Sequence, residues 1–358
     1  MNKIVGLAYQ VVEVPMKYTF KVSLGEISAI TSVIVKVETE NGIYGLGEAA
    51  PVPFVTGETI ATVKAALELF RPLLCGMEAN DISGVHAVMD RALKHNTAAK
   101  CAVDIALYDI KGKIMQAPLY QVLGGNKPTV VNDLTIGIDR PEKMAEKAKQ
   151  AVQAGFSIIK VKTGLNPADD VKAIALIRKA VGPDVVIRID ANQGYDLATA
   201  VDTLNRMKPY QVAAAEQCLP EWDFAGAAEL KQKVSGISLM LDESIHSPHD
   251  AMRAAKLRAA DTFNIKLMKC GGLYNAEKIN TIAEVNDINC MVGCMPETKI
   301  GITAGLSFVA AHANVTESDC DSFLLTKDPE MGMPGGFTRK GGVITLTDKP
   351  GLGIAYDF

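Results

Sequence analysis

Hydrophobic and polar residues alternate with a period of two over residues 1 to about 60. Residues 32–39 alternate most regularly and predict a β-strand. Glu40, Asn41 and Gly42 form a hairpin turn signal, and residues 43–48 predict the returning strand. The first part of the chain is therefore expected to form an antiparallel sheet.

Helical periodicity replaces this alternation between residue 60 and about residue 115. It is clearest over residues 97–109, where Ala98, Ala102 and Ala106 recur at a spacing of four and share one helix face. Small side chains on one face allow close packing against a neighbouring element. Because Gly124 and Gly125 then interrupt the pattern, we expect an α+β first domain.

From Val130 the chain alternates between strand-like and helix-like segments. Helices are expected to begin near Pro141, Pro167, Asp196, Phe224, Ser247, Ala276 and Gly301. Repeated strand–helix alternation is typical of a parallel α/β barrel, whose active site lies at the C-terminal ends of the strands.

The alternation stops after Asp321, and residues 341–346 resemble one further strand. That strand comes too late to belong to the barrel, so it is expected to return to the first domain. We therefore predict a capping domain over residues 1–125, completed by residues 330–358, and a barrel domain over residues 126–329.

Composition and charge exclude several classes of protein. The 358 residues are 48% hydrophobic with a net charge of −4, which gives no reason to expect nucleic acid or an anionic membrane as partner. No apolar run approaches the length of a membrane span, and the N-terminus lacks a secretory pattern. Seven scattered cysteines without a C-x-x-C pair favour free thiols in a reducing cytoplasm. The oligomeric state stays open, and a homo-oligomer is compatible with the sequence.

Charged residues end successive predicted barrel strands at intervals of 24 to 28 residues. Because strand side chains alternate, Lys160 and Lys162 point to the same side of their strand. A buried lysine is costly without a partner. The charged residues that end the next strands are Asp190, Glu216, Asp242 and Lys266.

The three carboxylates Asp190, Glu216 and Asp242 would repel one another at the mouth of a barrel. A hard divalent cation removes that repulsion, and Mg²⁺ prefers oxygen ligands. The alternative is that each carboxylate caps an ordinary loop. Three carboxylates in register, with lysines on the preceding and following strands, favour a metal site.

Lys162 and Lys266 fall on the second and sixth predicted strands, opposite each other across a barrel. A substrate between them would have one amine on each face of a carbon, which suits removing a proton from one face and returning one to the other. A metal holding the substrate carboxylate would stabilise the resulting enediolate and help to lower a lysine's pKa. Lys160 could contribute to that shift, bind substrate, or simply pair with a carboxylate.

This series of motifs resembles the enolase superfamily, and within it the muconate lactonizing enzyme subgroup. The resemblance implies a capping domain over a modified (β/α)7β barrel, Mg²⁺ on Asp190, Glu216 and Asp242, and Lys162 and Lys266 as acid and base. Cys218 departs from the proline usual in the subgroup. The matching motifs are Lys160-Val161-Lys162, Asp190-Ala191-Asn192-Gln193-Gly194, Glu216-Gln217, Asp242-Glu243-Ser244 and Lys266-Leu267-Met268-Lys269-Cys270-Gly271-Gly272.

Two aspartates distinguish activities within this subgroup. Asp319 and Asp321 lie at the end of the eighth predicted strand and resemble the pair that holds the free α-ammonium in dipeptide epimerases. Residues 293–298 resemble the same enzymes and should place Met295 and Pro296 beside the pocket, and Thr135 is expected there too. N-acylamino acid racemases and o-succinylbenzoate synthases, whose substrates lack that ammonium, remain the alternatives.

Side-chain specificity is expected from the loops 16–31 and 49–59. Family members that act on Ala-Glu commonly carry an arginine in the first loop, where this chain has Gly25. Phe54 and its neighbours make the second loop apolar. Dipeptides with a hydrophobic C-terminal residue are therefore expected to be preferred, although Lys17 or Lys21 could replace the arginine and restore L-Ala-D/L-Glu specificity. A protein that kept the barrel and lost its chemistry is disfavoured because the carboxylates and lysines are all present.

Overall fold

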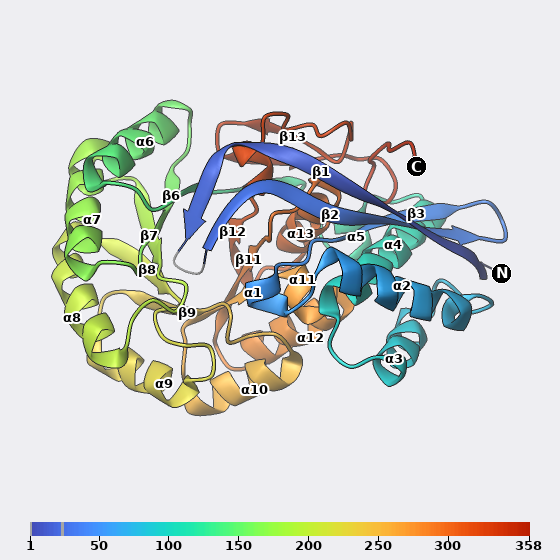
Figure 1. Ribbon diagram of the computed structural model, residues 1–358, viewed down its shortest axis with the longest axis horizontal. Helices are drawn as coiled ribbons and strands as arrows, with labels where there is room; N and C mark the ends of the chain where they lie inside the picture. The colour runs from blue at the N-terminus through green and yellow to red at the C-terminus, as the bar shows by residue number, and fades with distance from the viewer. Residues whose placement is uncertain (1, 23–24) are drawn as a thin grey trace.

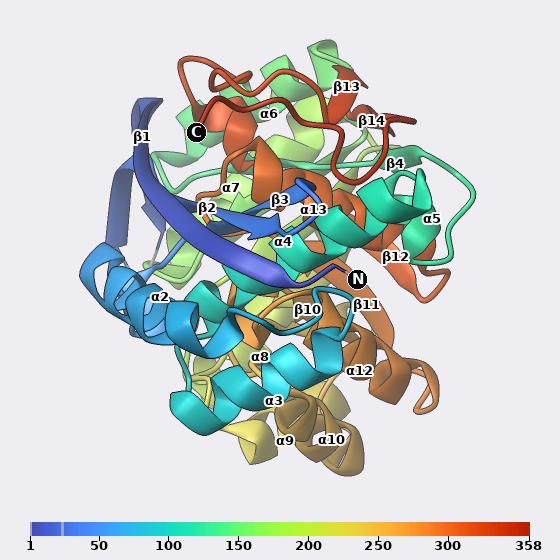
Figure 2. The same ribbon diagram turned by 90° about the vertical axis from the view of Figure 1, so that its right-hand side faces the viewer.

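The computed structural model describes residues 2–22 and 25–358, and its N-terminal part is an antiparallel sheet flanked by helices (Figure 1). The strands lie in the order β1 (Ile4–Val22), β2 (Gly25–Thr39) and β3 (Tyr44–Ala49). The predicted turn joins β2 to β3, with Gly42 at φ 79°. The helices are α1 (Pro53–Thr56), α2 (Ile60–Leu74), α3 (Ile82–Ala92), α4 (Thr97–Met115) and α5 (Leu119–Val122). Figure 2 shows how α2, α3 and α4 gather beside the sheet.

Helix α4 packs its small residues against β3, as the alanine spacing predicts. A Cβ added to Gly45 would lie 1.9 Å from the backbone oxygen of Ala106, and one added to Gly47 would lie 1.8 Å from that of Ala102. Both contacts are far shorter than atoms allow. The two glycines of β3 therefore let the helix backbone lie directly on the strand.

The second part is an eight-stranded parallel sheet whose strands follow each other in sequence order from β5 to β12. Seven strand–helix units and a final strand confirm the modified (β/α)7β barrel. The strands are β5 (Leu134–Ile136), β6 (Ile158–Lys162), β7 (Val186–Asp190), β8 (Val212–Glu216), β9 (Ser238–Leu241), β10 (Thr262–Ile265), β11 (Asn289–Gly293) and β12 (Val315–Asp319). The helices are α6 (Pro141–Gln153), α7 (Pro167–Val181), α8 (Leu197–Met207), η1 (Lys208–Tyr210), α9 (Phe224–Lys233), α10 (Pro248–Leu257), α11 (Leu267–Cys270), α12 (Leu273–Glu284), α13 (Lys299–Ala311) and η2 (Ser322–Leu325).

Side chains bridge the seam between the end strands β12 and β5. The backbone N–H of Thr135 donates to Asp321 Oδ2 at 2.7 Å. Asn132 Oδ1 accepts from Ser318 Oγ at 2.5 Å and from the Cys320 N–H at 2.9 Å. Two of the residues expected around the substrate, Thr135 and Asp321, thus also hold the barrel together.

The C-terminal segment differs in part from the expectation. β13 (Phe337–Lys340) and β14 (Val343–Leu346) form a three-stranded sheet with β4 (Thr129–Val131), which leads into the barrel, and not with β1–β3. Strand β4 offers a backbone edge in register with β14, and such edges need partners. The residues beyond β14 do reach the first domain, where the Leu119 N–H donates to Gly351 O at 2.8 Å. The domain boundaries stay a prediction.

The predicted specificity loop 16–31 is mostly a β-hairpin. Strands β1 and β2 continue to Val22 and Gly25, with a register irregularity between Pro15 and Phe20. The Lys327 N–H donates to Pro15 O at 3.0 Å, which attaches the hairpin to the segment after the barrel. β-branched and aromatic residues there favour strand over irregular loop, which explains the difference.

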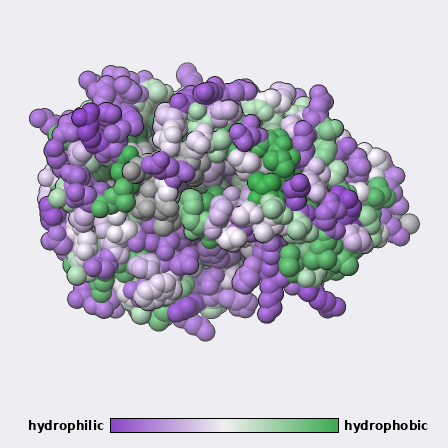
Figure 3. Space-filling view, in the orientation of Figure 1, coloured by the Kyte–Doolittle hydropathy of each residue, from purple (hydrophilic) through white to green (hydrophobic). Residues whose placement is uncertain are grey.

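Among the described residues, no helix is both long and apolar enough to cross a membrane. The face seen in Figure 3 is mainly hydrophilic, with separate hydrophobic patches.

Candidate active site

A pocket opens at the C-terminal ends of the barrel strands, beneath the hairpin and the loop that carries α1. Its empty space measures about 710 Å³, part of it open to solvent, which suits a small-molecule ligand. It brings together residues from both parts of the chain. The predicted residues that line it are Phe54, Thr135, Lys162, Lys266, Met295, Pro296, Asp319 and Asp321.

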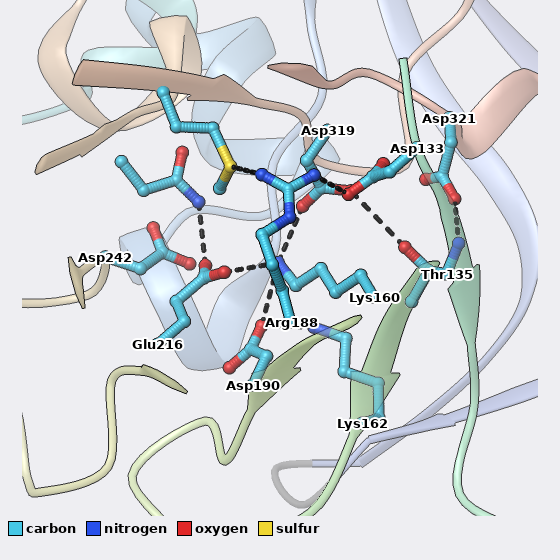
Figure 4. Close-up of polar contacts among 12 residues, drawn as sticks. Asp133, Thr135, Lys160, Lys162, Arg188, Asp190, Glu216, Asp242, Asp319 and Asp321 are labelled. Atoms are coloured by element: carbon cyan, nitrogen blue, oxygen red, sulfur yellow. Dashed lines mark hydrogen bonds and ion pairs between the residues drawn. The ribbon is translucent and has the colours of Figure 1, made fainter. Parts of the chain in front are cut away.

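The three predicted metal-ligating carboxylates lie together below this pocket. Oxygens of Asp190, Glu216 and Asp242 are all within 4.8 Å of one another, and the three residues are almost completely buried. Parallel register explains the arrangement, because Asp190 pairs with Glu216 across β7 and β8 and each ends its strand (Figure 4). Asp242 directly follows β9.

These carboxylates fit a hard divalent cation. Burial raises the pKa of Glu216, and the nearby charge of Asp190 raises it further. Burial also raises the pKa of Asp190 and Asp242, but neighbouring lysines outweigh it and lower both, so Asp190 and Asp242 are ready to serve as charged ligands. Every donor is a carboxylate oxygen, and opposite ligands of six-coordinate Mg²⁺ lie roughly 4 Å apart. Chemistry and spacing both suit Mg²⁺.

Lys160 lies deeper than expected, buried among carboxylates. Its Nζ is 2.7 Å from Glu216 Oε2, 3.0 Å from Asp190 Oδ2 and 2.6 Å from Asp319 Oδ2. Burial lowers its pKa, but the three carboxylates outweigh burial and hold the pKa well above its usual value. Lys160 is thus a charged link between the carboxylate cluster and Asp319, and it does not line the pocket itself.

Lys162 and Lys266 face the pocket from opposite sides of the barrel. Strands β6 and β10 are four strands apart in either direction round the eight. Lys162 Nζ donates to Asp190 Oδ2 at 2.6 Å, and Lys266 Nζ donates to Asp242 Oδ2 at 2.7 Å. Burial lowers the pKa of Lys266, but the carboxylates of Asp242, Glu216 and Glu243 together outweigh burial. They raise that pKa and do not produce the expected lowering.

Asp319 and Asp321 both reach the pocket from the end of β12. Thr135 Oγ1 donates to Asp319 Oδ1 at 3.3 Å, while the Thr135 N–H is bonded to Asp321. Burial and the charge of Asp319 raise the pKa of Asp321 to about 6. Asp133 lies within the same acidic cluster and is paired with Arg188 (Figure 4). A cationic group of a substrate would relieve this excess negative charge.

The specificity residues have mixed positions. Gly25 does not line the pocket, but it lies against Phe54, which does. A Cβ added to Gly25 would lie 3.5 Å from the Phe54 ring. The ammonium of Lys17 donates to Leu324 O at 2.9 Å and so is held at the rim. The missing arginine was inferred from residues 20–25. Of these, Ser23, Leu24 and the side chain of Lys21 lie outside the described residues.

Several pocket residues were not predicted. Asn192 and Glu243 stand inside motifs that carry the family resemblance, so their place beside Asp190 and Asp242 was a usable signal. Met16, Val52, Val55 and Cys294 lie in the segments 16–31, 49–59 and 293–298 that the sequence placed beside the pocket, and Ser322 directly follows Asp321. Leu325 gave no comparable signal.

Comparisons with known proteins place the chain in a family. A model described as the mandelate racemase / muconate lactonizing enzyme N-terminal domain matches residues 6–124, and one described as enolase C-terminal domain-like matches residues 143–358. The chain therefore belongs to the enolase superfamily, as its motifs indicated.

Its relatives include named epimerases. The hydrophobic dipeptide epimerase of Enterococcus faecalis is 40% identical over 346 residues, which cover 96% of this chain and 97% of the relative. The L-Ala-D/L-Glu epimerase of Clostridium acetobutylicum is 38% identical over 344 residues, 95% of each protein. A crystal structure of the dipeptide epimerase from Enterococcus faecalis V583, complexed with Mg and L-Leu-L-Tyr, has a TM-score of 0.96 at 39% identity and covers 99% of this chain and 100% of that one.

Proposed function

We propose that this protein is an Mg²⁺-dependent dipeptide epimerase, an isomerase that inverts the α-carbon of the C-terminal residue. The observation that carries the proposal is the layout of one pocket. Lys162 and Lys266 face it from opposite sides, a buried carboxylate triad lies below, and Asp319 and Asp321 stand at one wall.

The lysines would carry out the proton transfer. One takes the α-proton from one face of the substrate carbon while the other gives a proton to the opposite face. Asp190, Glu216 and Asp242 would hold Mg²⁺, which supplies charge stabilisation to the substrate carboxylate as the enediolate forms. Asp190 and Asp242 also hold the Lys162 and Lys266 ammonium groups through hydrogen bonds of 2.6 and 2.7 Å.

Asp319 and Asp321 would bind the free α-ammonium of a dipeptide. Their buried negative charge favours a cationic substrate end over the neutral amide of an N-acylamino acid. This supports a dipeptide epimerase over an N-acylamino acid racemase or an o-succinylbenzoate synthase built on the same scaffold.

A hydrophobic C-terminal side chain is the proposed preference. The pocket walls carry Met16, Val52, Phe54 and Leu325, and Lys17 is held at the rim by Leu324. A glutamate side chain would lose water there without gaining a paired charge.

Deuterium exchange tests the proposal. L-Leu-L-Tyr is incubated with the enzyme and Mg²⁺ in D₂O, and the products are analysed by mass spectrometry and chiral chromatography. We expect one deuterium at the C-terminal α-carbon together with the L,D diastereomer. Absence of α-deuterium from every hydrophobic dipeptide tried would refute the function, and equal exchange of N-acetylated substrates would favour the racemase alternative.

We further propose the division into a capping domain of residues 1–125 with 330–358 and a barrel domain of residues 126–329. A cytoplasmic location is proposed because the seven cysteines are free thiols. The net charge of −4 supports a protein that does not bind nucleic acid. A homo-oligomer is compatible with the sequence.

A further inference from the structure

A short hydrogen-bond chain leads from Lys162 along the pocket wall. Lys162 Nζ donates to Asn192 Oδ1 at 3.0 Å, and Asn192 Nδ2 donates to Glu243 Oε1 at 3.1 Å. All three side chains line the pocket, and all three residues are buried. The second carboxylate oxygen, Glu243 Oε2, is buried without a hydrogen-bond partner. The bond to Asn192 is therefore the contact that fixes this carboxylate.

The donors and acceptors along this series of hydrogen bonds determine which end of the Asn192 amide faces Lys162. The side-chain amide of Asn192 has one accepting and one donating end, and only the oxygen can accept from an ammonium. Glu243 accepts from the amide nitrogen, so it keeps the amide oxygen turned toward Lys162. With an apolar residue at position 243, the amide would lose a contact that selects this orientation over the one that presents its N–H groups to the ammonium.

Lys266 is oriented by a different set of contacts. Its Nζ donates to Asp242 Oδ2 at 2.7 Å, and the other oxygen of Asp242 accepts from Lys269 Nζ at 2.5 Å. The two opposed lysines are thus held by separate hydrogen bonds. The charge of Glu243 nevertheless also acts on Lys266, because burial lowers the pKa of Lys266 and the carboxylates that raise it include Glu243.

We propose that Glu243 is a positioning residue whose hydrogen bond acts through Asn192 to hold the Lys162 ammonium in its catalytic orientation, and so serves the Lys162 face of the reaction. The inference rests on the proposed function, because it assigns Lys162 and Lys266 to opposite faces of the substrate carbon.

The test compares deuterium exchange in D₂O on the two faces, starting separately from the L,L and the L,D dipeptide. Lys266→Ala and Lys162→Ala first identify which diastereomer each remaining lysine exchanges. We expect Glu243→Leu to slow exchange of the Lys162-dependent diastereomer by roughly ten- to a hundredfold, the range produced by a misplaced catalytic group, and to affect exchange of the other diastereomer clearly less. Glu243→Gln, whose side-chain oxygen can still accept from Asn192, should restore most of the lost exchange.

Two controls separate positioning from folding and substrate binding. Glu243→Met, unbranched and closer in shape to glutamate, is measured alongside Glu243→Leu so that a folding defect in one variant does not decide the outcome. In the Lys162→Ala background, Glu243→Leu and Glu243→Gln should change the residual exchange by Lys266 to the same extent, because both remove the charge that acts on Lys266.

Equal slowing of both diastereomers would overturn the proposal, since a structural or general binding role acts on both faces. A loss in Glu243→Gln as large as that in Glu243→Leu would overturn it too, because charge would then matter and not the hydrogen bond. Failure of the function itself would look different, with no exchange of either diastereomer by the unaltered enzyme.

Discussion

Lys160 Nζ lies 2.6 Å from Asp319 Oδ2, which joins the acidic pair at the end of β12 to the carboxylate cluster under the pocket. The same ammonium lies 2.7 Å from Glu216. A change at Asp319 would therefore disturb both the proposed ammonium site and the proposed metal site. Asp321 contacts Thr135 and not Lys160 in the described hydrogen bonds, so it is the cleaner position for testing substrate recognition.

Recognition of the free ammonium is tested with altered substrate and altered enzyme. N-acetylation of the dipeptide should lower kcat/KM by roughly 100-fold or more, because two buried carboxylates lose their cation. Asp321→Asn should raise KM for the free dipeptide and shrink the difference between free and acetylated substrates. Unchanged kcat/KM after acetylation would contradict the assignment.

The metal site is tested by removing one ligand. Asp190→Asn should lower kcat by roughly 1,000-fold, since several kcal/mol of charge stabilisation are lost. Mg²⁺ should raise the thermal midpoint of the unaltered protein and not that of the variant, because only the former binds the ion. Asp202→Asn on the exposed face of α8 is the matched control and should behave like the unaltered protein in both measurements.

Each of the two lysines proposed as acid and base should be indispensable for epimerisation. Lys162→Ala and Lys266→Ala should each abolish formation of the other diastereomer, because every turnover needs both groups. Each variant should still exchange the α-proton of one diastereomer, where the remaining lysine is the base. Near-normal epimerisation by Lys266→Ala, measured by chiral chromatography, would refute the assignment.

Specificity for the C-terminal side chain follows from the apolar walls. An aromatic side chain buried there gains about 2 kcal/mol, so dipeptides ending in Leu, Phe or Tyr should exceed L-Ala-L-Glu in kcat/KM by roughly 30-fold. A Cβ at Gly25 would meet the Phe54 ring at an ordinary contact distance, so Gly25→Arg should be tolerated. That variant should improve L-Ala-L-Glu relative to the hydrophobic dipeptides. A clear preference of the unaltered enzyme for L-Ala-L-Glu would show that the loops have been misinterpreted.

Stability should depend on the pH through Glu297, beside the pocket wall. Burial and the nearby carboxylate of Glu48 together raise its pKa to about 8. A folded-state pKa above the unfolded value of about 4.3 means that the stability contribution is full below that pH and is lost as the pH rises toward 8. Glu297→Gln cannot ionise, so its free energy of unfolding should fall less between about pH 5 and about pH 8.5 than that of the unaltered protein. Parallel curves from urea denaturation would contradict this.

The sequence by itself determined the barrel and the identity of its charged strand ends. Strand and helix periods are local, so they can be read without knowing which elements meet. Because parallel strands in register bring their C-terminal ends together, the spacing of Asp190, Glu216 and Asp242 was enough to predict that they cluster. The opposite strand positions of Lys162 and Lys266 suggested an acid/base pair, and the family resemblance implied the same roles.

Only the tertiary structure decided contacts between segments distant in sequence. The pairing of Lys160 with Asp319, the chain from Lys162 through Asn192 to Glu243, and the partner of β14 all depend on which side chains and edges face each other. Residues 16–31 were expected to form a loop. They form a hairpin because β1 and β2 continue to pair with each other beyond the residues that pair with β3. These relationships depend on packing and hydrogen bonding across the barrel and have no periodic signature in the sequence.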